Sequence, residues 1–332
     1  MNEASLTPER ILQTATAGWA AAVLGAGVIH SVFTHVEGGI DTPEALADKA
    51  DLSPRGAGAL LDGLVSLGFL TVSNGRYRNA PDAAEFLVEG KQTYFGGFPK
   101  VMLAELSDWP ALPDVVRTGK PTISETADLP ENPFWEQLVP AIAILAVPVA
   151  LAAAERLKLA EAGPVSILDV GGGSGVYSTI WLGLNRQARS TQIDWPNVNR
   201  IARESLARQG LADRFRPVDG DFHVADFGTA EYDVGVYSHI AHQESPAENV
   251  LLFRKLRKAL KAGGTLVISD FVVDDDRSGP PFPLLFRSEM LLRTKEGSTW
   301  RRSDYQGWLR EAGFWTVSFE TTPSPVTLVY AS

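Results

Sequence analysis

The chain has 332 residues and no cysteine, and its 40 acidic and 30 basic residues give a formal net charge of −10. The lack of cysteine excludes disulfides, thiolate metal sites and cysteine nucleophiles. The negative charge argues against a general affinity for nucleic acid or anionic membranes. The length allows two domains, and the N-terminus shows no signal-peptide pattern, so we expect a cytoplasmic protein.

The first predicted elements are apolar helices between Pro8 and Phe33. This stretch is rich in Ala, Ile, Leu and Val, carries few charges and contains Trp19. Apolar surface on this scale needs another surface to cover it. The stretch therefore predicts an interface with a second subunit.

Two further helices and a hairpin are predicted next. Thr42 and Ser53 are each followed by proline, which is typical of a helix start. Asn74-Gly75 lies between two short strand-like runs and predicts a hairpin turn. This order is that of a winged helix, a common DNA-binding arrangement. Because the second helix carries only Arg55 as a positive charge, we expect no DNA binding.

A proline-rich connection and an apolar helix follow. Residues 122–133 are polar and contain prolines, which predicts a connecting loop. The stretch from Phe134 to Ala154 is apolar but contains Pro140 and Pro148. It falls short of a comfortable membrane span and predicts a buried helix.

A glycine-rich run lies at the centre of the sequence. Apolar residues from Val165 lead to Asp169, and four glycines occur between Gly171 and Gly175. This pattern predicts a buried strand that enters a tight turn. Glycines let the backbone approach a ligand closely, and the helix predicted from Val176 would direct its N-terminal amides at the same ligand. Dinucleotide sites share such turns, so a Rossmann dehydrogenase stays open at this point.

The next two strands end in acids. Asp194 ends the second strand, 19 residues after Gly175. An acid at this position can accept hydrogen bonds from both hydroxyls of a ribose. Trp195 offers a ring against which an adenine could pack, and Asp221-Phe222 follows the third strand with another carboxylate. The pattern therefore favours a ligand that contains adenosine.

These three motifs, D-V-G-G-G-S-G from Asp169, D-W-P from Asp194 and G-D-F-H from Gly220, resemble those of class I S-adenosylmethionine-dependent methyltransferases. More narrowly, the chain resembles the small-molecule O-methyltransferases with an N-terminal dimerisation domain, of the acetylserotonin and hydroxyneurosporene type. The resemblance covers nearly the whole chain and implies S-adenosylmethionine as cofactor and S-adenosylhomocysteine as product. The cofactor-binding residues that it implies are Asp169, Gly171, Gly173, Asp194, Trp195, Asp221, Phe222 and Ser238.

The same resemblance implies a catalytic histidine. The family has S-x-x-x-H-D after the fourth strand, and this chain has S-H-I-A-H-Q, so His242 matches the general base. A neutral imidazole can take a hydroxyl proton near pH 7. Asp270, at the end of the fifth strand, matches the acid that orients the histidine. Gln243 replaces the usual Asp and Trp300 stands where a second acid is expected, so S- or C-methyl transfer stays open.

A metal site is a further alternative at this position, because His239, His242 and Glu244 are possible ligands. Three groups so close in sequence rarely converge on one ion, so we expect no metal.

The resemblance also implies which residues bind the acceptor. In the family, the helix after the linker, a lid matching Pro280 to Arg302 and residues of the partner subunit enclose the substrate. The substrate-binding residues expected here are Trp135, Phe286, Arg287, Met290 and His30. If Arg287 or Arg293 faces inward, we expect an acidic substrate of the methylthiohydroxybutyrate type. If both face solvent, the aromatic side chains favour a phenol or polyketide.

The fold implied by the resemblance is α/β. It comprises a C-terminal Rossmann-like class I methyltransferase sheet of seven strands, with the last hairpin reversed, and an N-terminal, mostly helical winged-helix dimerisation domain. The expected boundaries are 1–121 for dimerisation, 122–160 for the linker and interdomain helix, and 161–332 for catalysis. We therefore expect a homodimer that methylates the hydroxyl of a small molecule, without nucleic acid or membrane as partner. A ligand-sensing DNA-binding regulator and a family member with a non-methylating reaction are the rival hypotheses.

Overall fold

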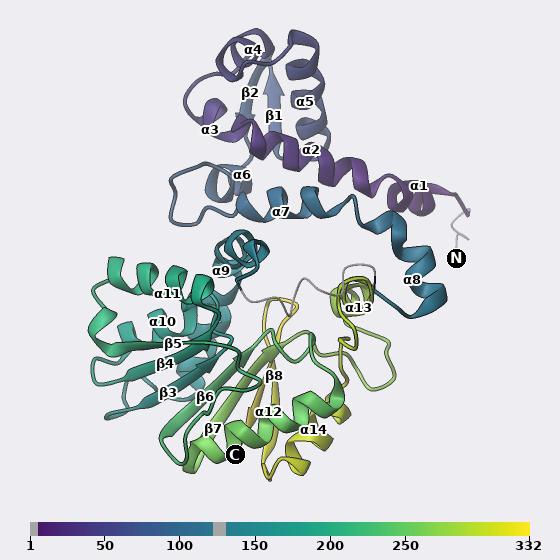
Figure 1. Cartoon of the computed structure of the whole chain (residues 1–332). Helices are drawn as coiled ribbons and strands as arrows, with labels where there is room; N and C mark the ends of the chain where they lie inside the picture. Colours follow the sequence, from purple (N-terminus) through teal and green to yellow (C-terminus); the bar gives the residue numbers. More distant parts are fainter. Residues whose placement is uncertain (1–5, 122–130) are drawn as a thin grey trace, which may run out of the picture. The chain divides into compact units, whose positions relative to one another are not determined.

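The computed structural model describes residues 6–121 and 131–332. The chain folds into two compact units, Met1–Trp109 and Pro110–Ser332, each with its own hydrophobic core (Figure 1). Most of the predicted connecting loop, residues 122–133, lies outside the described residues.

Helices and one hairpin make up the N-terminal unit. The starts of two helices agree with the sequence prediction, because the hydroxyl of Thr42 accepts a hydrogen bond from the N–H of Ala45 and that of Ser53 from the N–H of Gly56. The elements are α1 (Glu9–Ala15), α2 (Ala17–Ile29), α3 (Val32–Glu37), α4 (Pro43–Ala50), α5 (Pro54–Ser66), β1 (Leu70–Ser73), β2 (Arg76–Asn79), α6 (Pro81–Phe86) and α7 (Gly97–Glu105). The strands β1 and β2 pair antiparallel, as predicted for the hairpin.

The C-terminal unit alternates helices and strands. Its elements are α8 (Leu112–Thr118), α9 (Pro133–Arg156), β3 (Ser166–Val170), α10 (Val176–Leu184), β4 (Arg189–Asp194), α11 (Pro196–Arg208), β5 (Phe215–Asp219), β6 (Tyr232–Ser238), α12 (Pro246–Ala259), β7 (Leu260–Asp270), α13 (Pro281–Arg293), α14 (Arg302–Glu311), β8 (Val317–Thr321) and β9 (Thr327–Ala331). Short 3₁₀ turns occupy Trp109–Ala111 and Ala212–Arg214.

Within the described residues, the strands of this unit form one seven-stranded sheet of order β5-β4-β3-β6-β7-β9-β8. The strands from β5 to β7 pair in parallel, and β9 is antiparallel to both of its neighbours. The chain order reverses at β3, which has β4 on one side and β6 on the other. Ligands of such sheets bind at the carboxyl ends of the strands beside this reversal. Asp169, Asp194, Ser238 and Asp270 all lie at these ends.

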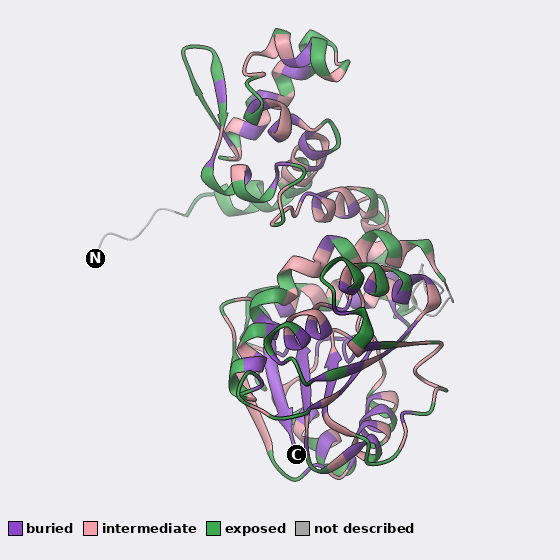
Figure 2. Cartoon of the chain, turned by 90° about the vertical axis from the view of Figure 1, so that its left-hand side faces the viewer, coloured by how far each residue is buried: buried purple, intermediate pink, exposed green. Residues whose placement is uncertain are grey.

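The sheet is buried between helices, and its strands are the most buried part of the unit (Figure 2). Helix α9 packs on α10, and the indole N–H of Trp181 donates a hydrogen bond of 2.8 Å to the carbonyl of Ala150. By length and composition α9 is apolar enough to cross a membrane, as is the bent pair α1 and α2. Val149, Ala150 and Ala153 of α9 pack in the core of this unit, whereas Leu145, Val147 and Leu151 are exposed, so the helix is only partly buried and the prediction of a buried helix holds in part.

Candidate active site

The glycine-rich turn lies directly above a buried acid. Asp169 is fully buried at the end of β3, and within the described part of the chain neither of its carboxylate oxygens has a hydrogen-bond partner. A Cβ atom on Gly172 would lie 2.7 Å from the carboxylate carbon of Asp169 and 2.5 Å from Oε1 of Gln192. No side chain fits there, and Gly171 has a φ of 66°, which favours glycine. The glycines therefore let the turn lie against the acid.

Asp194 fixes this turn from the neighbouring strand. Its Oδ2 accepts a hydrogen bond of 2.9 Å from the N–H of Gly173, and its Oδ1 accepts one of 2.8 Å from the N–H of Trp195. Two buried amides that the sequence analysis did not select complete the support. Gln192 donates to the carbonyl of Gly173 and to Asn199, and Asn199 donates to the carbonyl of Asp194.

Within the described residues, no ion pair joins Asp169 or Asp194 to a basic side chain. Burial raises the pKa of Asp169 to about 7, and the charge of Asp194 adds to the rise. Burial likewise raises the pKa of Asp194 to about 7, against the two backbone hydrogen bonds. A buried carboxylate is stabilised when a ligand supplies hydrogen-bond donors or positive charge. A ribose diol and an amino acid ammonium offer both, so these residues fit an adenosyl amino acid.

Apolar and aromatic side chains surround the turn. A Cβ atom on Gly171 would lie 2.5 Å from Cδ1 of Ile240 and 3.8 Å from Cε1 of Phe222. A Cβ atom on Gly173 would lie 3.5 Å from Cγ1 of Val139, on α9. Trp135 lies one helical turn before Val139, and its buried indole N–H has no partner in the described ranges. Phe222 thus lies beside the glycine turn, and the ligand contacts expected for Phe222 and Trp135 stay predictions.

The predicted catalytic pair forms a dyad. The Nδ1 of His242 lies 2.7 Å from Oδ1 of Asp270, and the backbone N–H of His242 donates 3.1 Å to Oδ2. Burial alone would raise the pKa of Asp270, but the charge and hydrogen bond of His242 outweigh it and lower the pKa. An ionised carboxylate only accepts hydrogen bonds, so Nδ1 carries a proton, and in the neutral imidazole Nε2 is then the acceptor. This is the tautomer that a general base requires.

The residues that depart from the family pattern support this loop in other ways. Trp300 donates its indole N–H, at 2.8 Å, to the carbonyl of Ala241, next to His242. Gln243 donates to the carbonyl of His239. Burial lowers the pKa of His239 to about 4, so this imidazole is neutral. The cluster proposed for a metal differs from the prediction. Asp270, rather than Glu244, has an oxygen within 4.8 Å of ring nitrogens of both histidines, whereas Glu244 contacts His223.

Three phenylalanines line one side of His242. The ring of Phe286, from α13, lies 5.1 Å from the imidazole in an edge-to-face arrangement, and Phe271 lies 5.9 Å from it. Phe282 packs on both Phe271 and Phe286. Phe286 was predicted to bind substrate, but Phe271 and Phe282 were not selected. Their side chains meet only because α13 folds back towards the end of β7.

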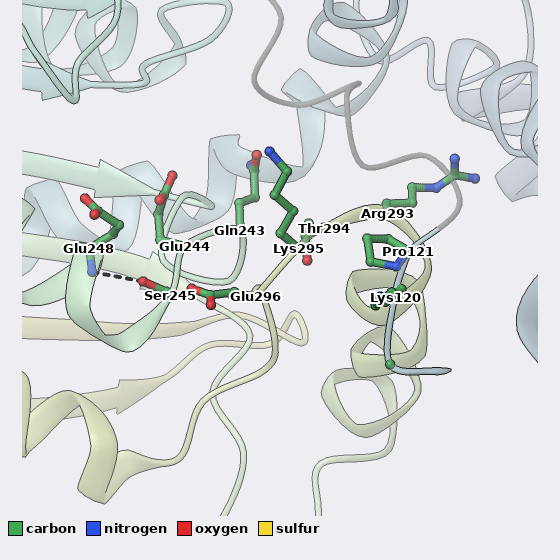
Figure 3. A pocket seen from close by; sticks show the side chains of 11 residues that line it. Lys120, Pro121, Gln243, Glu244, Ser245, Glu248, Arg293, Thr294, Lys295 and Glu296 are labelled. Atoms are coloured by element: carbon green, nitrogen blue, oxygen red, sulfur yellow. Dashed lines mark hydrogen bonds between the residues drawn. The ribbon is translucent and has the colours of Figure 1, made fainter. Parts of the chain in front are cut away.

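A cavity of about 530 Å³ opens beside the loop that carries His242 (Figure 3). Its lining mixes charges of both signs, including Lys120, Glu244, Glu248 and Arg293. Arg293 also pairs with Glu289 on the same helix. An acidic substrate would therefore meet carboxylates as well as cations in this cavity.

The remaining predicted substrate residues are spread over both units. Arg287 is exposed on α13, whereas Met290 is buried there. His30 lies in the N-terminal unit, exposed at the end of α2. The substrate roles of Arg287, Met290 and His30 stay predictions.

Comparison with known proteins agrees with this geometry. Residues 128–315 match the model of an O-methyltransferase domain. A 3-hydroxy-5-methyl-1-naphthoate 3-O-methyltransferase of Streptomyces sahachiroi is 32% identical over 92% of this chain and 89% of its own. The tetracenomycin polyketide synthesis 8-O-methyl transferase of Streptomyces glaucescens is 28% identical over 97% and 95%. The crystal structure of human N-acetylserotonin methyltransferase in complex with S-adenosylmethionine has the same fold, with a TM-score of 0.85, 23% identity and coverage of 100% and 99%.

The match of the domain model and the extent of the Streptomyces likeness agree with the three motifs and with the ligand that Asp169 and Asp194 fit. The chain belongs to the O-methyltransferase family and is an S-adenosylmethionine-dependent methyltransferase that acts on small molecules.

Proposed function

We propose that the chain methylates the hydroxyl of a small aromatic molecule, with His242 as general base. The observation that carries this proposal is the His242–Asp270 dyad beside the three phenylalanines. Aromatic rings pack well against such side chains, in stacked or edge-to-face arrangements. The names of the two Streptomyces relatives, which describe methylation of a naphthoate and of a tetracenomycin polyketide, support an aromatic acceptor.

Each part of the site has a separate task in this reaction. When bound, S-adenosylmethionine supplies a methyl group on a positively charged sulfur, which leaves with the electrons of the broken bond. Asp194 and the turn at Gly173 orient the adenosyl part. Nε2 of His242 takes the proton from the acceptor hydroxyl as the oxygen–carbon bond forms, and Asp270 stabilises the imidazolium. The phenylalanines exclude water and hold the ring plane, so that the oxygen is aligned with the methyl carbon.

A matched pair of acceptors tests this proposal. A 3-hydroxy-1-naphthoate and 1-naphthoate differ only in the hydroxyl group. We expect release of S-adenosylhomocysteine, and a product heavier by one CH₂ group, with the first compound and none with the second. Equal turnover of both would show that the hydroxyl group does not receive the methyl group.

Replacement of Phe286 by alanine is expected to raise KM for an aromatic acceptor by roughly tenfold, because a ring contact worth about 1.5 kcal/mol is lost. The effect on kcat should be smaller, since the dyad is unchanged. Steady-state kinetics at saturating S-adenosylmethionine measure both values. Leu285→Ala on the same helix is the control, because Leu285 is 67% exposed. An equal rise of KM in both variants would contradict the role of Phe286.

We also propose that the N-terminal unit forms a homodimer and does not bind DNA. Ile11, Leu12, Trp19 and Ile29 on α1 and α2 are all more than half exposed, which is costly in a monomer. The replacement Trp19→Asp is expected to raise the dissociation constant of the dimer by about tenfold or more, since a large apolar side chain is replaced by a charge. Light scattering over a dilution series measures this. Trp315→Asp, at an exposed tryptophan of the other unit, should leave the dimer unchanged.

A further inference from the structure

A histidine outside the catalytic dyad lies between two carboxylates. Nδ1 of His223 is 2.7 Å from Oδ1 of Asp221, and Nε2 is 3.1 Å from Oε1 of Glu244. The backbone N–H of His223 also donates to Asp221 at 2.8 Å. Both ring nitrogens therefore face a carboxylate oxygen, and a doubly protonated imidazolium satisfies both contacts. Asp221, His223 and Glu244 are called the His223 cluster below.

The His223 cluster joins two segments that form the ligand site. Phe222, which precedes His223, follows β5 and lies against Gly171 of the glycine turn. Ile240, which follows β6, lies against the same glycine, and His242 is two residues further on. Glu244 belongs to this second segment. The contact between His223 and Glu244 thus connects the segment after β5 to the segment that carries the general base.

Other bonds hold the first segment to helix α12. Lys255 donates to the carbonyls of Phe222 and His223, at 2.6 and 3.0 Å, and its ammonium lies 4.2 Å from the centre of the Phe227 ring. Asn249, also on α12, donates to the carbonyls of Ala241 and Glu244, so this helix holds both segments. Among the hydrogen bonds of the described residues, that between His223 and Glu244 joins the two segments directly.

We propose that His223 is a positioning residue of the methyltransferase: as an imidazolium between Asp221 and Glu244 it holds the segments after β5 and β6 in the arrangement that binds S-adenosylmethionine. This role rests on the methyltransferase activity and not on the identity of the acceptor. In this role His223 needs no contact with cofactor or acceptor. It acts through Phe222 and Ile240 on one side and through the loop of His242 on the other.

The surroundings of the ring support the charged form. The hydrogen bond to Glu244 raises the pKa of His223 to about 9, with burial acting against the rise and Asp221 adding to it. Lys255, Lys258 and Asp226 are the other charged groups around the adjoining cavity of about 320 Å³. Because the pKa is raised in the folded protein, the contribution of His223 to stability is complete below its ordinary value near 6.5 and is lost as pH rises through about 9.

Calorimetric titration with S-adenosylhomocysteine tests the proposal without an acceptor. At pH 7.5, His223→Gln is expected to bind about tenfold more weakly than wild type, because glutamine cannot supply two charge-assisted donors. At pH 10 the wild-type ring is also neutral, so the ratio of the two dissociation constants should fall towards one. The ligand, Asp169 and Asp194 titrate in both experiments, so their contribution to the pH dependence of the two dissociation constants cancels in the ratio. His35→Gln, in the N-terminal unit, is the control and should match wild type at each pH.

The variant Glu244→Gln provides a second readout. Glu244→Gln removes the carboxylate that raises the pKa of His223 most. In a protein that carries Glu244→Gln, the effect of His223→Gln on the dissociation constant should therefore disappear at a lower pH. A ratio near one at pH 7.5, or a ratio that does not change with pH, would overturn the positioning role. Failure of wild type to bind the ligand at any pH would instead overturn the cofactor assignment, and the role of His223 with it. Thermal unfolding at pH 7.5 verifies that both variants are folded.

Discussion

The variant His242→Ala is expected to lose roughly 10²- to 10⁴-fold in kcat while its affinity for S-adenosylhomocysteine stays that of wild type. The imidazole takes a proton from the acceptor, whereas the adenosyl part is held by residues at the ends of β3 and β4. Stopped assays with an aromatic acceptor and calorimetry with the product measure the two quantities. The residual activity should rise steeply with pH, because an acceptor that ionises in solution no longer needs a base.

Asp270→Asn separates the base from the group that orients it. An amide at this position can accept from Nδ1 only through its oxygen, and its NH₂ group favours the wrong tautomer of His242. We expect a loss of roughly 10²-fold or more in kcat.

Turnover of His242→Ala equal to wild type would contradict the role of His242 as general base. It would indicate a thioether or another acceptor that needs no base.

The second large effect is expected at the cofactor site. Asp194→Ala should weaken binding of S-adenosylhomocysteine by roughly 10²-fold or more, because two hydrogen bonds to a charged acceptor are lost and the N–H of Gly173 loses its partner. Calorimetry measures this in the absence of an acceptor. Asp213→Ala, at an exposed acid of the same unit, should bind like wild type.

Affinity for the product should also depend on pH. Burial raises the pKa of Asp194 to about 7, so below this pH the ligand-free protein holds a proton on the carboxyl group. A protonated carboxyl accepts the ribose hydroxyls poorly, and we expect affinity to rise between pH 5.5 and 8. For the same reason the ligand-free protein should lose stability as pH rises from about 4 through 7, because folding binds protons in this range. Asp194→Asn should show both dependences in reduced form, and an unchanged slope would contradict the assignment.

Much of the site could be predicted because its chemistry follows short, local patterns. Four glycines after Asp169 can only serve a turn that lies close to other atoms, and the contact between Gly172 and the acid confirms this geometry. Asp194 ends the neighbouring parallel strand, so its place beside the turn follows from the topology of the sheet. Asp270 ends β7, and His242 follows the end of the adjacent parallel strand β6, so their proximity also follows from the topology.

Other parts of the site depend on contacts that no local pattern reveals. His223 and Glu244 are 21 residues apart and belong to different loops, so their contact depends on the spacing of β5 and β6. Phe282 packs on Phe271, which contacts His242, because the chain folds back after β7. The hydrogen bond between Gln192, on β4, and Asn199, on α11, was not predicted, because no local pattern marks either residue.

Two departures from the family pattern illustrate how packing replaces one interaction by another. Trp300 stands where the family has a second acid, and this difference left S- or C-methyl transfer open. In the structure Trp300 donates to the backbone carbonyl beside His242, and Gln243 holds the carbonyl of His239. Both side chains stabilise the loop through its backbone, so the position of His242 does not require a second carboxylate.

The position of the transferred methyl group in the product tests directly whether a hydroxyl oxygen is the acceptor. Wild-type protein is incubated with S-adenosylmethionine that carries ¹³C in its methyl group and with a hydroxylated naphthoate, and the product is examined by NMR. We expect a labelled methyl carbon bonded to oxygen, with one S-adenosylhomocysteine formed for each product molecule. A label bonded to ring carbon would contradict hydroxyl methylation by the His242–Asp270 dyad.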